Sequence, residues 1–293
     1  MKDDSKSSIN NGVIRTMDLK QTPVRILYGC ILAVGITVSF IGAAPLIWVF
    51  LSGFKEIREF VREPTILPRT FDFGVYVKTW NQLHFGRYYL NSLISVTGSV
   101  VCAVFFNGLL GYALSKVRPV GSKIILSLVM WCLLIPGATS VVPLFININK
   151  LGLTESFIPL WFSIGASAFF VVLFKNFFDE LPQSLVDAAR IDGAGNFTIF
   201  ARIAIPLSKA IIIVIVMYSI NRAWSDFLLP FLILSNSNLE TVMVRLFYFK
   251  SGDWTSDVDV LRAVVFAVIP PIVLFFIFQK QIAQVTIHSG IKG

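Results

Sequence analysis

The hydrophobic positions of this chain fall into six long apolar runs separated by shorter polar segments. The runs cover residues 26–51, 89–115, 124–148, 157–178, 207–234 and 262–282. An α-helix rises about 1.5 Å per residue, so about 20 apolar residues cross a hydrocarbon core of roughly 30 Å. The pattern therefore predicts an all-α integral membrane protein with six transmembrane helices. We expect a polar lead at residues 1–25, a membrane domain at residues 26–285 and a short tail at residues 286–293.

Composition supports this class. Of the 293 residues 55% are hydrophobic and 14% are charged, whereas soluble chains carry about 25% charged residues. The net charge of +8 is typical of basic residues that flank membrane spans, and no nucleic-acid-reading motif is present. The three cysteines, Cys30, Cys102 and Cys132, lie inside apolar runs without metal-site spacing. Since no paired-carboxylate, Ser/His/Asp or phosphate-loop arrangement occurs, we expect no catalytic residues, no metal, no cofactor and no nucleic-acid partner.

Basic residues indicate the orientation of the spans. Lys116, Arg118 and Lys123 follow the second run without any acidic residue between them, which is typical of a cytoplasmic loop. Six spans then place both termini in the cytoplasm. Residues 52–88 and 235–261 become outer loops, the first with a short amphipathic helix near its start.

The segment of residues 179–206 separates two strongly apolar runs and reads as two short helices joined by a turn. Pro182 suits the first turn of a helix, and Gly193 suits the position just past its end, where φ is positive. One face of the second helix would carry Phe197, Phe200, Ala201 and Ala204. Small residues would let another backbone come close: Ala188, Ala189, Gly193, Ala194 and Gly195. The pattern favours a docking element over a reactive site.

The same segment resembles the EAA motif of ATP-binding-cassette importer permeases. The resemblance is carried by Asp187-Ala188-Ala189, Ile191-Asp192-Gly193-Ala194 and Ile205-Pro206. Asp187 departs from the pattern, since the family usually has Glu there. The resemblance implies a cytoplasmic coupling helix between the fourth and fifth spans, seated in a groove of an ATPase subunit through Asp187, Ala188, Ala189, Asp192, Gly193 and Ala194. The alternative is a chance Ala/Gly-rich loop between helices.

Further residues are similar to the carbohydrate branch of that family, near the second, smaller permease of the maltose system. They are Asn91-Ser92-Leu93, Gly111-Tyr112-Ala113-Leu114, Ile135-Pro136, Pro143-Leu144-Phe145, Trp224-Ser225-Asp226-Phe227 with Pro230, and Gly290-Ile291-Lys292-Gly293. The resemblance implies a sugar importer in a bacterial plasma membrane. It also implies several partners: a homologous permease in a heterodimer, two ATPase subunits that hydrolyse the ATP, an extracytoplasmic solute-binding protein and membrane lipid.

Polar residues inside the fifth run are candidates for the substrate path. Arg222 and Asp226 lie one helical turn apart in apolar surroundings, where ionisable groups are rare. Asn221 or Asp226 would contact sugar hydroxyls, and Trp224 would stack on a sugar ring. The alternative is an intrahelical pair of Arg222 with Asp226 that holds the helix in register near the outer face.

The outer loop of residues 235–261 contains a cluster of aromatic residues: Phe247, Tyr248, Phe249 and Trp254. Such residues can anchor the binding protein or form an interfacial belt at the lipid headgroups. Alternation along an extended segment would place Phe247 and Phe249 on one face and Tyr248 on the other.

Other functions fit the residues less well. A stand-alone secondary transporter would need an internal repeat and a buried proton or sodium site, and neither is evident. A membrane enzyme would need a catalytic constellation. We therefore expect a permease subunit of a binding-protein-dependent importer, with a non-sugar solute as the alternative to a sugar.

Overall fold

The computed structural model describes residues 22–63, 65–235, 237–252 and 255–290, with the backbone alone at residues 138 and 282–290. All regular elements in these ranges are helices. Contacts divide the chain into two compact units, residues 1–71 and residues 72–293. Each unit is described separately.

The first unit is built on one long helix, α1 (Thr22–Ser52), whose apolar side chains are mostly exposed. The predicted short helix after it is α2 (Ile57–Arg62). Phe54 is buried, with its ring against Phe71 at 5.3 Å between centroids. The buried Lys55 donates a hydrogen bond from Nζ to the carbonyl of Thr65. These contacts fold residues 53–71 back on themselves.

The second unit begins with α3 (Gly74–Gln82) and a helical stretch that runs from Phe85 to Val117. This stretch comprises α4 (Phe85–Cys102), a π-helix (Ala103–Asn107), α5 (Gly108–Tyr112) and a second π-helix (Ala113–Val117). The following helices are α6 (Ser122–Cys132), α7 (Gly137–Lys150), α8 (Ile158–Gly165), α9 (Ala168–Glu180), α10 (Gln183–Ile191) and α11 (Asn196–Ile199). After a third π-helix (Phe200–Ala204) come α12 (Ile205–Leu207), α13 (Lys209–Ser225), α14 (Leu228–Leu234), α15 (Val242–Ser251) and α16 (Asp257–Gly290).

The helices long and apolar enough to cross a membrane are three in the described part of the chain: residues 22–52, 85–117 and 257–281. Two bent pairs could add a span each, which gives up to five. The first pair is α8 with α9, bent by 45°, and the second is the helical stretch of residues 196–207 with α13, bent by 85°. The described helices therefore support a multi-span membrane protein, and the number six stays a prediction.

Three predicted spans are not single helices, and the fourth of the six, residues 157–178, is the bent pair α8 with α9. The third, residues 124–148, is broken between Cys132 and Gly137, because Pro136 disfavours helical backbone at the residue before it and itself has ψ of 127°. The fifth, residues 207–234, begins only after the 85° bend, where the Ser208 hydroxyl bonds to the Ala204 carbonyl at 2.7 Å. It ends at Ser225, because Asp226 is extended.

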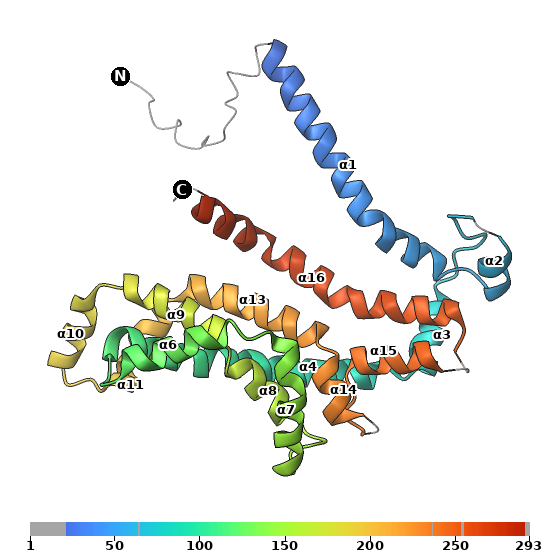
Figure 1. Cartoon of the computed structure of the whole chain (residues 1–293). Helices are drawn as coiled ribbons and strands as arrows, with labels where there is room; N and C mark the ends of the chain where they lie inside the picture. Colours follow the sequence, from blue (N-terminus) through green and yellow to red (C-terminus); the bar gives the residue numbers. More distant parts are fainter. Residues whose placement is uncertain (1–21, 64, 236, 253–254, 291–293) are drawn as a thin grey trace. The chain divides into compact units, whose positions relative to one another are not determined.

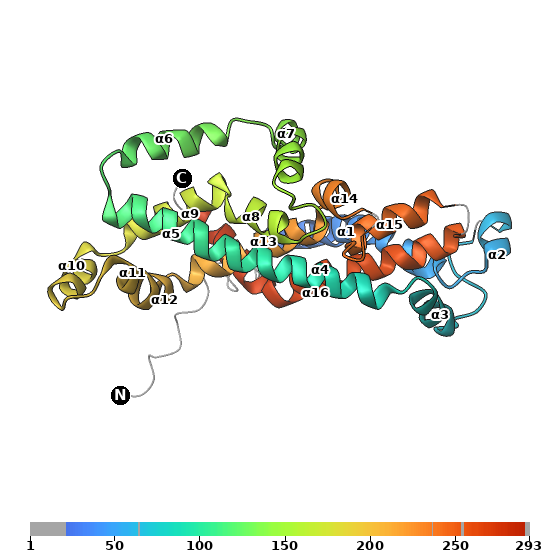
Figure 2. The ribbon, with the colours of Figure 1, turned by 90° about the horizontal axis from the view of Figure 1, so that it is seen from below.

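The second unit has its connecting helices at opposite ends. Helices α10, α11 and α12 lie at one end, and α3 and α15 lie at the other (Figures 1 and 2). A core of aromatic residues supports the first end: Tyr112, Phe174, Phe178 and Phe200. A second core around Phe85, Trp224 and Phe249 supports the other end. The long helices therefore hold two separate candidate sites apart.

Candidate functional site: coupling segment, pocket and outer helix

The segment of residues 179–206, here called the coupling segment, has the local structure that its sequence predicts. Helix α10 is followed by a turn in which Gly193 has φ of +82°, as expected, and α11 begins three residues later. The amide of Gly193 donates to the Arg190 carbonyl at 3.0 Å, and the amide of Ala194 donates to the Ala189 carbonyl at 2.9 Å. These bonds satisfy carbonyls at the end of α10, which is the usual function of a left-handed residue there.

One face of the segment is packed against the core. Val186 and Ala189 of α10 are buried with Tyr112 and Phe178. The predicted face of the second helix is wrong at Phe197 and Ala201, which are exposed. Phe200 and Ala204 of the predicted face are buried, together with Ile199, which the prediction did not include. A π-helix begins at Phe200, and its wider turn changes the register that a regular α-helical spacing assumes.

The opposite face combines apolar and small residues and is open. Ile191 is 87% exposed and Phe197 is 60% exposed, with Leu185 also exposed. Among the predicted coupling residues Asp187, Ala188, Asp192 and Gly193 are exposed, Ala194 is half-buried and Ala189 is buried. The Asp187 carboxylate accepts a hydrogen bond from Gln183 at 3.1 Å, and Arg190 approaches it at 3.8 Å. Exposed apolar residues next to small ones are typical of a surface that meets a partner.

Polar side chains outside the predicted coupling residues connect the coupling segment to the membrane helices. Lys116 is buried and donates from Nζ to the Leu181 carbonyl at 2.7 Å. Ser115 donates to Asp179 at 2.6 Å, and Lys175 pairs with the same carboxylate at 2.5 Å. From sequence Lys116 was only a marker of the cytoplasmic side. No local signal indicates this role, because the fold alone brings residues 65 positions apart into contact.

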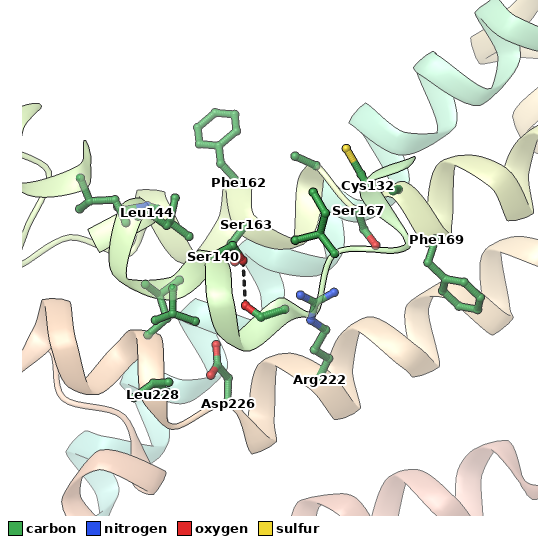
Figure 3. A pocket seen from close by; sticks show the side chains of 18 of the residues that line it. Cys132, Ser140, Leu144, Phe162, Ser163, Ser167, Phe169, Arg222, Asp226 and Leu228 are labelled. Carbon is green, nitrogen blue, oxygen red and sulfur yellow. Dashed lines mark hydrogen bonds between the residues drawn. The ribbon is translucent and has the colours of Figure 1, made fainter. Parts of the chain in front are cut away.

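A pocket of about 1090 Å³ lies between the broken helices α6–α7, α8–α9 and α13–α14. Its lining is largely aliphatic and aromatic. Figure 3 shows the side chains of Arg222 and Asp226 pointing from the end of α13 toward the part of the pocket that carries Ser140 and Ser167. The hydroxyls of Ser140 and Ser163 already donate to carbonyls one turn earlier in their own helices.

Of the three predicted substrate-path residues, the structure brings only Asp226 into this pocket. Asn221 is exposed outside it. Trp224 is buried with its ring against Tyr89, and its indole N–H donates to the Ala267 carbonyl at 3.0 Å. In this conformation Trp224 therefore does not face the pocket. Arg222 and Asp226 do not form a close intrahelical ion pair, since α13 ends before Asp226 and the ion pairs of the described residues do not include one between them; Arg222 acts on this carboxylate from a longer distance.

The aromatic cluster of the predicted outer loop lies on a helix, α15. The expected alternation is therefore wrong, because successive residues of a helix point about 100° apart and not to opposite faces. Phe249 is fully buried with its ring 5.8 Å from Phe85. Phe247 is 42% exposed and packs on Phe227 and Phe231. Tyr248 is half-buried, and Trp254 lies outside the described residues.

Side chains at the start of α4 form hydrogen bonds with the backbone of residues 238–242, which leads into α15. Asn91 donates to the carbonyls of Asn238 and Glu240 at 3.0 and 2.9 Å, and Arg87 donates to that of Asn238 at 3.1 Å. The amide of Val242 donates to the Ser92 hydroxyl at 2.9 Å. In the sequence, Asn91 and Ser92 contribute only to the family resemblance. The structure shows that they fix the backbone that leads into α15.

Metal ligands are not grouped in the described residues, where no cluster of three or more His, Cys, Asp or Glu side chains occurs. The arrangement is thus a set of apolar helices with an exposed surface of apolar and small residues at one end, a pocket between broken helices, and at the other end a helix held by hydrogen bonds to the start of α4. The family model of the binding-protein-dependent transport system inner membrane component matches residues 89–287, well over half of the chain. The chain belongs to this family of inner membrane transport subunits, and it is a permease subunit of a binding-protein-dependent importer.

Several relatives align over most of their length. The diacetylchitobiose uptake system permease protein NgcG of Streptomyces coelicolor is 27% identical, over 84% of this chain and 82% of its own. The arabinooligosaccharides transport system permease protein AraQ of Bacillus subtilis is 29% identical, over 85% of this chain and 90% of its own. The inner membrane ABC transporter permease protein YcjP of Escherichia coli is 28% identical, over 94% and 99%.

A solved structure shares the fold. One chain of a bacterial ABC transporter involved in the import of the acidic polysaccharide alginate superposes with a TM-score of 0.77. The match covers 89% of this chain and 98% of that chain, with 22% sequence identity. This chain therefore has the same overall fold as that chain.

Proposed function

We propose that this chain is one of two homologous membrane subunits of an ATP-driven importer for a sugar or oligosaccharide. The printed functions of relatives such as NgcG, AraQ and the melibiose/raffinose/stachyose import permease MelC support a sugar as the solute. In this proposal six spans cross a bacterial plasma membrane, and both termini and residues 179–206 face the cytoplasm. ATP hydrolysis takes place in two separate ATPase subunits.

The observation that carries the proposal is the two-sided character of the coupling segment. Its inner face is fixed by Val186, Ala189 and the Lys116 bond to Leu181, while its outer face exposes Ile191 and Phe197. A rigid support under an open apolar surface transmits a push from a docked partner to the long helices. We infer that closure of the ATPases moves α10 and α11 and thereby switches the pore from inward-facing to outward-facing.

Replacing Ile191 with glutamate should uncouple the importer. Ile191 is almost fully exposed, so the change leaves the fold intact but places a charge in an apolar contact, which costs roughly 1–3 kcal/mol at a docked surface. We expect about a tenfold or larger loss of uptake and of binding-protein-stimulated ATPase activity in proteoliposomes that hold the whole complex.

Val120 offers a matched control for this change. It is fully exposed in the turn before α6, outside the coupling segment, so Val120→Glu should retain uptake. Equal uptake by wild type and by a fully assembled Ile191→Glu complex would show that this face does not dock the ATPase.

The exposed side of α15 is the proposed contact for the extracytoplasmic binding protein. Phe247 and Tyr248 reach its surface, whereas Phe249 is part of the core. The double change Phe247→Ser and Tyr248→Ser should therefore lower the stimulation of ATPase activity by the binding protein several-fold, with the basal activity nearly unchanged and a smaller loss of melting temperature than a core substitution causes.

Phe249→Ser separates docking from folding. Because Phe249 is fully buried, this change should instead lower the melting temperature of the complex, as loss of a core phenylalanine costs about 3–5 kcal/mol. Full stimulation by the binding protein in the double variant, together with crosslinks from position 247 to lipid alone, would assign these side chains to the membrane interface.

A further inference from the structure

Arg222 has no role in the coupling just proposed, yet its side chain lines the pocket. It lies in the last turn of α13, exposed toward the pocket that also contains Asp226 and Ser167 (Figure 3). It is thirteen positions after Lys209, which at 1.5 Å per residue is about 20 Å along the helix. With the coupling segment in the cytoplasm, that distance places Arg222 in the outer half of a hydrocarbon core of roughly 30 Å.

The guanidinium of Arg222 makes no close ion pair within the described residues. Neither the ion pairs nor the side-chain hydrogen bonds found there involve it. The nearest acidic group in the pocket, Asp226, does not come within ion-pair distance of it. A cation among apolar side chains without a partner is costly, so such residues usually mark a path for a solute or ion.

Burial opposes the charge of Asp226, while Arg222, from beyond ion-pair distance, and the neighbouring backbone amides favour it. The backbone N–H groups of Phe227, Leu228 and Leu229 face its carboxylate. Hydrogen bonds and amide dipoles of this kind favour the ionised form of a carboxylate. These amides therefore share the compensation of Asp226 with Arg222, and the guanidinium N–H groups of Arg222, which make no hydrogen bond within the described residues, remain able to donate to a ligand.

The other residues that line the pocket strengthen the electrostatic attraction of the Arg222 guanidinium for an anion. Most of it is aliphatic or aromatic, including Leu144 and Phe162, so electrostatic attraction is stronger there than in water. The hydroxyls of Ser140 and Ser163 are bonded to carbonyls. Arg222 is the basic side chain among the described lining residues, and its planar fork matches a carboxylate with two parallel hydrogen bonds.

We propose that this pocket receives a sugar that bears a carboxylate, such as the uronate unit of an acidic oligosaccharide, and that Arg222 determines this specificity by pairing with the carboxylate. A single guanidinium balances one carboxylate charge, whereas a phosphate would bring a charge of about −1.5 to −2 at neutral pH. A pocket of about 1090 Å³ is large enough for a short oligosaccharide, since ligand pockets measure about 300–1,000 Å³. The proposal rests on the proposed function, because it takes the pocket as part of a sugar path.

Cys132 provides a direct test, since it lines the same pocket and is a free, exposed thiol. The whole complex in lipid nanodiscs is treated with the uncharged reagent N-ethylmaleimide, and alkylation of this chain is followed by mass spectrometry. Trigalacturonate is compared with maltotriose as the protecting sugar, without the binding protein, so that delivery does not set the preference. Cys30, which lies on α1 and does not line the pocket, is the internal control.

Trigalacturonate should slow alkylation of Cys132 and not of Cys30, while maltotriose should have little effect. Arg222→Gln should remove the protection, with a loss of about tenfold or more in apparent affinity for trigalacturonate, and Arg222→Lys should keep part of it. Arg58→Gln, a change of the same type at an exposed position of α2, should leave protection unchanged. In proteoliposomes with the binding protein, Arg222→Gln should lower uptake of trigalacturonate by a similar factor.

Two results would overturn the proposal. Equal protection by both sugars that is insensitive to Arg222→Gln would exclude a preference for carboxylates and leave the sugar importer intact. If neither sugar slows alkylation and Arg222→Gln transports trigalacturonate like wild type, the pocket is not a binding site for acidic sugars. The proposed function is tested separately, because it fails only if neither sugar nor binding protein stimulates the ATPase of the wild-type complex.

Discussion

An importer that carries Gly193→Val should assemble in the membrane and yet lose most of its transport, by about tenfold or more. Gly193 has φ of +82°, and a Cβ added there would meet no atom within 4 Å. The cost of valine is therefore conformational: a left-handed backbone costs an ordinary residue roughly 1–2 kcal/mol, and a β-branched residue more. The turn can relieve this strain only by moving, which displaces the exposed face of α10 from α11. Uptake and stimulated ATPase activity in proteoliposomes measure the effect.

Two further variants distinguish a requirement for left-handed backbone at position 193 from a requirement for a small residue at the docking surface. Gly193→Asn should retain most of the activity, because asparagine tolerates left-handed backbone better than other side chains. Gly195→Val should also be tolerated, since Gly195 is extended with φ of −70° and has open space around it. If Gly193→Val transports normally, the turn geometry has no part in coupling. If Gly195→Val fails as severely, close approach of the ATPase and not φ is the requirement.

Gly111→Ala should destabilise the packing of the membrane helices. Its Cβ would lie 2.7 Å from the Cβ of Phe174, 3.0 Å from the amide nitrogen of Lys175 and 3.1 Å from the Val171 carbonyl oxygen. Two of these atoms are backbone atoms of α9, so α5 and α9 would have to separate. We expect a cost of about 1–3 kcal/mol from overpacking, seen as a lower melting temperature of the detergent-solubilised complex.

Gly108→Ala is the matched control, three residues earlier in α5. The nearest atoms to its added Cβ are ring carbons of Phe174 and Phe200 at 3.5 and 3.6 Å, which is ordinary contact. Alanine is also favoured over glycine inside a helix by about 1 kcal/mol. Gly108→Ala should thus be neutral or stabilising. An unchanged melting temperature for Gly111→Ala would mean that the two helices can move apart at little cost.

The class of the protein and the geometry of the coupling turn were determined by local sequence. Long apolar runs specify membrane helices because the bilayer responds to the hydrophobicity of each run separately. The positive φ of Gly193 follows from its place after α10, and the break before Gly137 follows from Pro136, since proline restricts the residue before it. Each of these features depends on residues a few positions apart.

The tertiary structure alone decided where side chains point and what they contact. Trp224 faces Tyr89 and Ala267 instead of the pocket, and Phe249 is buried against Phe85 because α15 is a helix fastened to the start of α4. The hydrogen bond from Lys116 to the Leu181 carbonyl is likewise a contact that only the tertiary structure creates. These contacts join residues far apart along the chain, and the direction of a side chain around a helix depends on the packing of neighbouring helices. A hydropathy pattern contains no information about that packing, so only the tertiary structure places Arg222 in a pocket together with residues of α7 and α8.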